Sequence, residues 1–174
     1  MTIKIELISK SELADESFNI AIDGLKPREI YRVEMFLSDY YCINAPMLLA
    51  HDVLWRSTGT FVSDKNGIID ISQTPSCSGS YEDIATMGLF FNAKPLTNRK
   101  KKLPNSLSKI PLLDHFFVGI KIMQGNTVIA ERTFTRHYMS SQISHQDIYG
   151  KHFQGRLFYD KKAIKTPSID YCER

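Results

Sequence analysis

Residues 115–137 read HFFVGIKIMQGNTVIAERTFTRH, and this stretch decides the fold class. Every second residue in its first half is large and apolar, namely Phe116, Val118, Ile120 and Ile122. Successive side chains of a strand point to opposite faces of a sheet, so these four can line one buried face. Gly125-Asn126 then suits a two-residue turn that begins with glycine, and residues 127–135 follow as the returning strand. The stretch therefore predicts a hairpin of an antiparallel sheet.

The same period of two recurs along the rest of the chain. Further strands are predicted over residues 3–7, 18–22, 30–38, 55–62 and 155–159. Asn66-Gly67, between Phe61-Val62 and Ile68-Ile69, predicts another hairpin, and residues 11–16 could form one turn. Seven to nine short strands without a long helix predict an all-β antiparallel sandwich, which we expect to be a single domain over residues 1–174.

The composition is that of a globular domain and excludes several classes of protein. The chain has 174 residues, of which 43% are hydrophobic and 24% charged, enough for one core. Its 22 basic and 19 acidic residues give a net charge of +3, too small to indicate a nucleic-acid partner. Cys42, Cys77 and Cys172 form no CxxC pair, which favours a reducing compartment, the cytoplasm. The N-terminus lacks the apolar run of a signal peptide, and no stretch predicts a membrane span.

Glycine and histidine spacing excludes the common catalytic motifs. No two of the nine glycines are four or two positions apart, which excludes G-x-S-x-G and G-x-G-x-x-G. Gly150 and Gly155 have phosphate-loop spacing, but Arg156-Leu157 stands where lysine and a hydroxyl residue are required. The histidines form no metal-binding motif, and no nucleophile is identifiable for Asp114-His115. We therefore expect no catalytic residue, no cofactor and no metal site.

A basic run is the sharpest charge feature of the sequence, and it has two interpretations. It consists of Arg99, Lys100, Lys101 and Lys102. Its summed field could attract a phosphate or another anion. Alternatively, it is a solvated loop between two strands.

An unusual block combines Gly79-Ser80-Tyr81 with Met87-Gly88-Leu89-Phe90-Phe91. We interpret it as a tight turn that enters a buried strand, with Met87, Leu89 and Phe91 filling the core. Ser80 has no base near it in the sequence, so it is not expected to act as a nucleophile.

At this block the sequence resembles the N-terminal domain of the acyl-CoA thioesterase and bile acid-CoA:amino acid N-acyltransferase family. Four segments, spread over roughly residues 15–165, carry the resemblance in the family's order. They are the turn with Gly24 and Pro27, the stretch from Trp55 to Asp70 with Gly67, the block of Gly79, Ser80, Tyr81, Met87, Gly88, Leu89 and Phe90, and the strand that begins at Gly155. Asp83, Thr86, Phe91 and Asn92 stand where the family has glycine, proline, tryptophan and serine.

The resemblance implies an immunoglobulin-like β-sandwich that precedes an α/β-hydrolase domain. In the family, that second domain carries the nucleophile, the aspartate and the histidine, and it cleaves an acyl-CoA thioester or passes the acyl group to an amino acid. No position here matches this triad, and Tyr171-Cys172-Glu173-Arg174 falls about where the first hydrolase strand should begin. We therefore expect the catalytic domain to be absent from this chain. The leading hypothesis is a non-catalytic accessory domain that packs on a hydrolase domain and borders an acyl-chain cavity.

Two other hypotheses stay open. The chain could be a standalone module that binds acyl-CoA, a lipid or a protein partner, with the basic run at residues 99–102 meeting the phosphates of coenzyme A. It could also be a hydrolase with an unfamiliar site, so enzyme activity of the chain on its own is left open. Because a face that a hydrolase domain would cover is bare, we also expect weak self-association into a homodimer.

Overall fold

Strands dominate the described part of the chain. The structure, a computed structural model, describes residues 2–40, 53–96, 114–151 and 154–162. The chain divides into two compact units, Met1–Tyr138 and Met139–Arg174, and each is described by itself. The predicted all-β antiparallel fold is confirmed. The immunoglobulin-like subtype and the single domain over residues 1–174 stay predictions.

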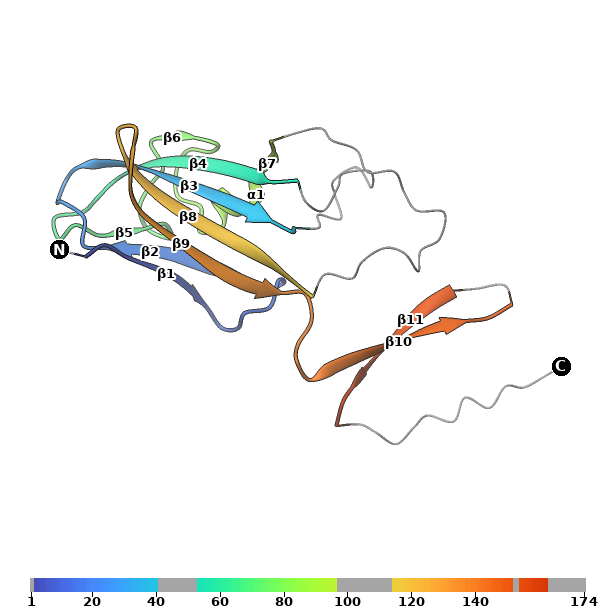
Figure 1. Cartoon of the computed structure of the whole chain (residues 1–174). Coiled ribbons are helices and arrows are strands. Elements are labelled where there is room, and N and C mark those ends of the chain that lie inside the picture. The colour runs from blue at the N-terminus through green and yellow to red at the C-terminus, as the bar shows by residue number, and fades with distance from the viewer. Residues whose placement is uncertain (1, 41–52, 97–113, 152–153, 163–174) are drawn as a thin grey trace. The chain divides into compact units, whose positions relative to one another are not determined.

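The first unit contains two antiparallel sheets (Figure 1). The smaller sheet has the order β1 (Lys4–Ser9), β2 (Phe18–Asp23) and β5 (Ile69–Asp70). The larger sheet has the order β6 (Ser78–Gly79), β4 (Trp55–Val62), β3 (Ile30–Ser38), β8 (His115–Gln124) and β9 (Thr127–His137), and β7 (Lys94–Pro95) pairs with β4. One short helix, α1 (Gly88–Phe91), is present among the described residues.

The apolar residues of both sheets meet in one core, as a sandwich requires. The larger sheet contributes the alternating residues of β3 and β8, namely Tyr31, Val33, Met35, Leu37, Phe116, Val118, Ile120 and Ile122. The smaller sheet contributes Phe18, Ile20 and Ile22 from β2. Each fully buried side chain of this size contributes roughly 1.5–3 kcal/mol, so the alternating residues of β2, β3 and β8 together contribute a large part of the stability. The predicted turn at Gly125-Asn126 joins β8 to β9, which is confirmed.

The second unit holds an antiparallel hairpin of β10 (Ile143–Tyr149) and β11 (Gln154–Asp160). Asp147 lies opposite Arg156, whose guanidinium Nε and an Nη donate to its two carboxylate oxygens at 2.6 and 3.0 Å. The sequence predicts β11 but not β10, because residues 144–147 are all polar and show no alternation. A strand that is paired on one side and largely exposed does not need that pattern.

The hairpin predicted at Asn66-Gly67 is wrong in its pairing, although the turn itself forms. The Asp64 N–H donates to the Ile68 carbonyl at 2.9 Å, and Gly67 has a φ of 78°. However, β4 belongs to the larger sheet, whereas β5 pairs with β2 of the smaller one. The turn carries the chain from one sheet to the other, because Ile69 and Ile71 enter the core.

The strand predicted after Gly79 is also wrong at Met87 to Phe91. Gly88–Phe91 forms a single helical turn, in which Leu89 is 1% exposed and Phe91 is 77% exposed. A helical turn places residues two apart on different sides, so Leu89 enters the core and Phe91 leaves it. The interpretation that Phe91 fills the core is therefore overturned.

Asp70 ties β5 to β2 through its carboxylate. Asn19 Nδ2 donates to it at 2.7 Å, and the Ser72 N–H and hydroxyl donate at 3.0 and 2.6 Å. Burial alone would raise the pKa of Asp70. The hydrogen bonds from Ser72 and Asn19 outweigh burial, so the pKa lies below its ordinary value of 3.8.

Acid is therefore expected to destabilise the fold partly through Asp70. Its pKa is lower in the folded than in the unfolded chain, so its contribution is fully present above the ordinary value of 3.8 and is lost as the pH falls through the folded value. In Asp70→Asn, the free energy of unfolding should vary less with pH between about pH 5 and pH 2 than in the wild type. Urea unfolding, followed by the fluorescence of the single tryptophan Trp55, measures this. Exposed Glu82→Gln is the control, and an unchanged pH dependence in Asp70→Asn would contradict the prediction.

Candidate functional site

Ser80 of the unusual block is held by the backbone of β4. Its N–H donates to the Thr58 carbonyl at 2.7 Å, and its hydroxyl oxygen accepts from the Thr58 N–H at 2.9 Å. Gly79, with a φ of 130°, continues the pairing of β6 to β4. In the described part of the chain no histidine or carboxylate contacts the Ser80 hydroxyl. This serine therefore attaches the block to β4 through two hydrogen bonds to the backbone of Thr58.

Gly88 packs directly against the ring of Tyr81. A Cβ at Gly88 would lie 2.5 Å from the Tyr81 ring, so only glycine lets the helical turn approach the ring this closely. The Tyr81 hydroxyl is buried, and it has no hydrogen-bond partner among the residues that the structure describes. Burial raises the pKa of Tyr81 to about 12, so it is a neutral phenol near pH 7 and not a base.

A pair of variants tests this contact. Gly88→Ala should lower the free energy of unfolding by about 1–3 kcal/mol, although alanine favours a helix, because its methyl group collides with the ring. In a Tyr81→Ala background the same substitution should cost nothing or be stabilising, a non-additivity of about 1–3 kcal/mol. Urea unfolding of the four proteins measures the cycle. Additive effects would show that the ring contact does not explain the glycine.

The rest of the block packs into the aromatic end of the core. The Met87 sulfur accepts from the Phe18 N–H at 3.3 Å, and Leu89 is buried. The Phe90 ring meets the rings of Phe18 and Tyr40 edge-on, at centroid distances of 5.7 and 5.4 Å. Such contacts stabilise the fold and offer no reactive atom.

The two remaining turns of the family resemblance meet each other. The Leu25 N–H donates to the Gly67 carbonyl at 3.0 Å, and a Cβ at Gly67 would lie 2.0 Å from the Leu25 carbonyl oxygen. Gly24, with a φ of 84°, and exposed Pro27 belong to the same turn as Leu25. We call the place where this turn meets the turn at Gly67 the corner between the two sheets. Gly155 lies in β11 with open space beside it, so no close approach explains it. The basic run Arg99, Lys100, Lys101 and Lys102 lies outside the described residues, as do His51 and His152.

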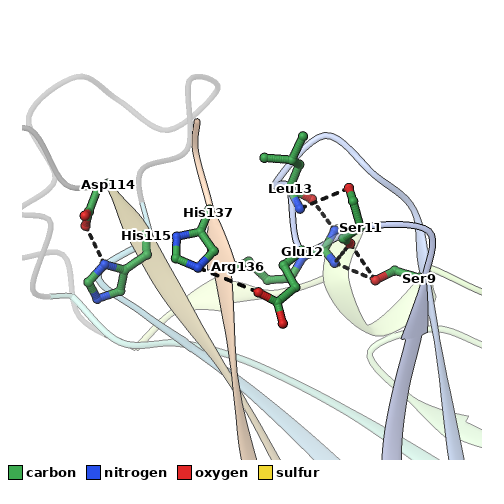
Figure 2. A network of polar contacts seen from close by, with 8 residues as sticks. All are labelled: Ser9, Ser11, Glu12, Leu13, Asp114, His115, Arg136 and His137. Carbon is green, nitrogen blue, oxygen red and sulfur yellow. Dashed lines mark hydrogen bonds and ion pairs between the residues drawn. The ribbon is translucent and has the colours of Figure 1, made fainter. Parts of the chain in front are cut away.

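Arg136 forms a polar network that the sequence analysis missed (Figure 2). Its side chain, from β9, is 1% exposed and reaches the loop between β1 and β2. The guanidinium donates to the Ser9 hydroxyl at 2.9 Å and to the carbonyls of Ser11 (2.8 Å), Leu13 and Glu16 (2.6 Å), and it lies 5.3 Å from the Phe18 ring centroid. Arg136 is two residues from Phe134, so both side chains lie on the inward side of β9. This spacing is the only sign in the sequence that Arg136 is buried.

Two histidines lie at the same end of the larger sheet, on the opposite face from Arg136. His115 and His137 are register partners on β8 and β9, with ring centroids 6.0 Å apart. His115 Nδ1 is hydrogen-bonded to the Asp114 carboxylate, and His137 Nε2 lies 3.8 Å from Glu12 Oε2 (Figure 2). The neighbouring serines Ser9 and Ser11 bond to Arg136 or to backbone groups and to neither imidazole. The arrangement is therefore two separate histidine–carboxylate contacts, and among the described residues neither imidazole is hydrogen-bonded to a serine.

Two kinds of feature are absent from residues 2–40, 53–96, 114–151 and 154–162. No three histidine, cysteine or acidic side chains lie close enough together to hold a metal ion. No helix there has the length and hydropathy needed to cross a membrane.

Comparison with known proteins gives relatives that are much longer than this chain. The chain is 24% identical to bile acid-CoA:amino acid N-acyltransferase of Mus musculus over 171 residues, which cover 95% of this chain and 38% of the relative. It is 22% identical to acyl-coenzyme A thioesterase 6 of Mus musculus over 179 residues, covering 97% and 38%. It is 28% identical to acyl-coenzyme A amino acid N-acyltransferase 1 of Mus musculus over 95 residues, covering 55% and 20%. The chain thus spans less than two fifths of these relatives.

The family's own sequence profile covers most of the chain. The profile described as "Acyl-CoA thioester hydrolase/BAAT N-terminal region" matches residues 15–149. This range includes both sheets of the sandwich, apart from β1, and the block of residues 79–81 and 87–91 that contacts Thr58. Asp83, which stands where the family signature has glycine, has a φ of 67°, a conformation that aspartate tolerates better than most residues. This chain belongs to the family of acyl-CoA thioester hydrolase/BAAT N-terminal regions.

Proposed function

We propose that this chain is a non-catalytic accessory domain that packs against an α/β-hydrolase domain acting on acyl-CoA thioesters. One observation carries the proposal: the residues of the family signature make packing and backbone contacts within the sandwich. Ser80 is bonded on both sides to Thr58, and Gly88 accommodates the Tyr81 ring. A sandwich held in this way is a rigid wall beside which a neighbouring domain can build an acyl-chain cavity.

The chemistry of acyl transfer supports the same assignment. Thioester cleavage needs a nucleophile within hydrogen-bond reach of a base, and donors for the developing oxyanion. In the described part of the chain, Ser80 contacts only backbone, Tyr81 is a neutral phenol near pH 7, and His137 pairs with Glu12. Names such as thioesterase and acyltransferase belong to the longer relatives, so the bond-breaking step is assigned to the partner domain.

Hydrolysis of palmitoyl-CoA by the purified chain tests the proposal. Thiol release, detected with a disulfide dye, should equal the rate without protein. Exposed Cys77 will itself react with the dye, so a Cys77→Ser variant and a sample without substrate are run in parallel. Multiple turnovers per chain that disappear in Ser80→Ala would overturn the proposal.

A second candidate function, a standalone module that binds acyl-CoA or a lipid, is favoured by one cavity. A hollow of about 390 Å³ lies between β1 and β9. Its lining combines apolar Ile3, Ile5 and Ala130 with polar and charged Thr2, Lys4, Glu131 and Arg132. Calorimetric titration with palmitoyl-CoA below its micelle concentration decides between the two functions. Saturable heat that is lost in Ala130→Trp would favour the binding module.

We also propose that the protein works in the cytoplasm. The exposed free thiol of Cys77 supports a reducing compartment.

A further inference from the structure

The larger sheet has an outer face whose side chains carry an excess of positive charge. On β3, Tyr31, Val33, Met35 and Leu37 enter the core, so Arg32, Glu34 and Phe36 lie on the opposite side. Directly paired residues of neighbouring strands share a face, which adds Arg56 opposite Phe36, Lys121 opposite Glu34, and Lys94 opposite Arg56. We call Arg32, Arg56, Lys94 and Lys121, together with Phe36, the cationic face.

The carboxylates on this side do not balance the cations. Glu34 is 5% exposed, and its Oε1 is shared by Arg56 at 2.5 Å and Arg32 at 3.1 Å. Lys121 lies 3.4 Å from Glu131. Among the described residues Lys94 has no acidic partner, and it stands opposite another cation, Arg56. Like charges opposite each other across two strands are destabilising, and a carboxylate supplied from outside would relieve the repulsion.

Phe36 lies among these cations as an apolar centre. The Arg56 guanidinium carbon is 5.9 Å and the Lys121 nitrogen 5.4 Å from the centroid of its half-buried ring. On β8 the residue opposite Phe36 is Gly119, where a Cβ would still be 3.8 Å from Phe36 Cβ and 3.9 Å from Thr133 Oγ1. Because Gly119 has no side chain, β8 does not cover the Phe36 ring at this register position.

We propose that the cationic face is a docking surface for a protein partner that presents Asp or Glu side chains around an apolar residue. This inference rests on the proposed accessory function and names the surface that would meet the partner. A second copy of this chain fits less well, because two such faces would oppose cations to cations. An anionic lipid surface also fits less well, since the guanidinium groups lie against the sheet, with Arg32 and Arg56 only 39% exposed.

The test uses the whole chain and a synthetic acidic probe. The probe is the peptide DELFEDE, and its uncharged isostere NQLFQNQ is the control peptide. Amide shifts in ¹⁵N–¹H spectra should move at Gly119, Thr58 and Thr133, for the acidic peptide alone. In Lys94→Ser/Lys121→Ser the dissociation constant should rise about tenfold, and it should rise with salt. The matched control, Lys26→Ser/Lys65→Ser, removes the same charge from exposed loop positions and should change the affinity less than about twofold.

The outcomes are distinct. Shifts elsewhere on the molecule, equal binding of NQLFQNQ, unchanged affinity in Lys94→Ser/Lys121→Ser, or no binding at millimolar peptide would overturn the inference. Tighter binding to phosphatidylserine vesicles than to the peptide, lost in the same variant, would assign the face to a lipid surface and also overturn it. Both substituted lysines are at the surface, so loss of folding is not expected, and Trp55 fluorescence checks it. The palmitoyl-CoA assay does not depend on the peptide titration. Turnover of palmitoyl-CoA would therefore contradict the proposed function without altering the docking result.

Discussion

Arg136→Ala is expected to lower the free energy of unfolding by about 3–5 kcal/mol. The guanidinium is buried, and it satisfies one hydroxyl and three backbone carbonyls of the loop between β1 and β2. Removing it takes a donor from each acceptor. The Ser11 and Leu13 carbonyls keep a second donor, Ser9 Oγ at 2.6 Å and the Glu16 N–H at 3.2 Å, whereas an acceptor that stays buried and unpaired costs about 1–3 kcal/mol. Burial lowers the pKa of Arg136, while the charges of Glu12, Glu16 and Asp15 act in the opposite direction.

Urea unfolding followed by Trp55 fluorescence measures the effect. Lysine keeps the positive charge of Arg136 but not its planar set of N–H donors. Arg136→Lys should therefore recover less than half of the free energy of unfolding that Arg136→Ala loses. Arg132→Ala, on the same strand, removes an exposed arginine with one backbone contact to Ile5, and should cost about 1 kcal/mol or less. Equal effects of Arg136→Ala and Arg132→Ala would mean that the network in Figure 2 does not hold the loop.

Gly67→Ala is expected to destabilise the fold by about 3 kcal/mol or more. Two costs combine at this position. The backbone has a φ of 78°, which is unfavourable for alanine, and the new Cβ would lie 2.0 Å from the Leu25 carbonyl oxygen. A backbone oxygen cannot swing aside as a side chain can, so the corner between the two sheets has to open.

Gly125→Ala provides the matched control for Gly67→Ala. Gly125 also has a positive φ, of 59°, but nothing lies within 4 Å of a Cβ built there. Its substitution should therefore cost only the conformational term, about 1–2 kcal/mol. Thermal or urea unfolding gives the loss in free energy of unfolding for both variants. The amount by which the loss in Gly67→Ala exceeds that in Gly125→Ala measures the collision with Leu25. Equal losses at the two positions would show that the corner tolerates the methyl group.

Most of the strands could be predicted because their signal is local. The period of two in residues 18–22, 30–38 and 116–122 reappears as β2, β3 and β8, with the apolar residues inside. The strand Trp55–Val62 has the predicted bounds, and Gly125-Asn126 makes the predicted turn. Each of these predictions uses only residues that are neighbours in the sequence.

The residues of the candidate site also divide into those that local sequence patterns explain and those that only contacts distant in the sequence explain. The sequence predicts that Ser80 is not a nucleophile because no base is near it in the sequence, and this stays a prediction. The structure adds that Ser80 is hydrogen-bonded to the backbone of Thr58. The reason for Gly88 lies in its contact with Tyr81, seven residues away along the chain, and no periodicity could reveal it. Arg136 was missed because a single arginine near a strand end looks the same whether its side chain is solvated or buried.

The all-β antiparallel fold could be predicted from the chain alone, because alternation and turn residues act over a few positions. Three outcomes are visible only in the folded chain: the turn at Asn66-Gly67 switches sheets, Leu89 and not Phe91 enters the core, and Lys94, Arg56 and Lys121 share one face. These outcomes depend on which strands pair and in which register. Pairing is set by burial between segments that are distant in the sequence, and no local pattern encodes it.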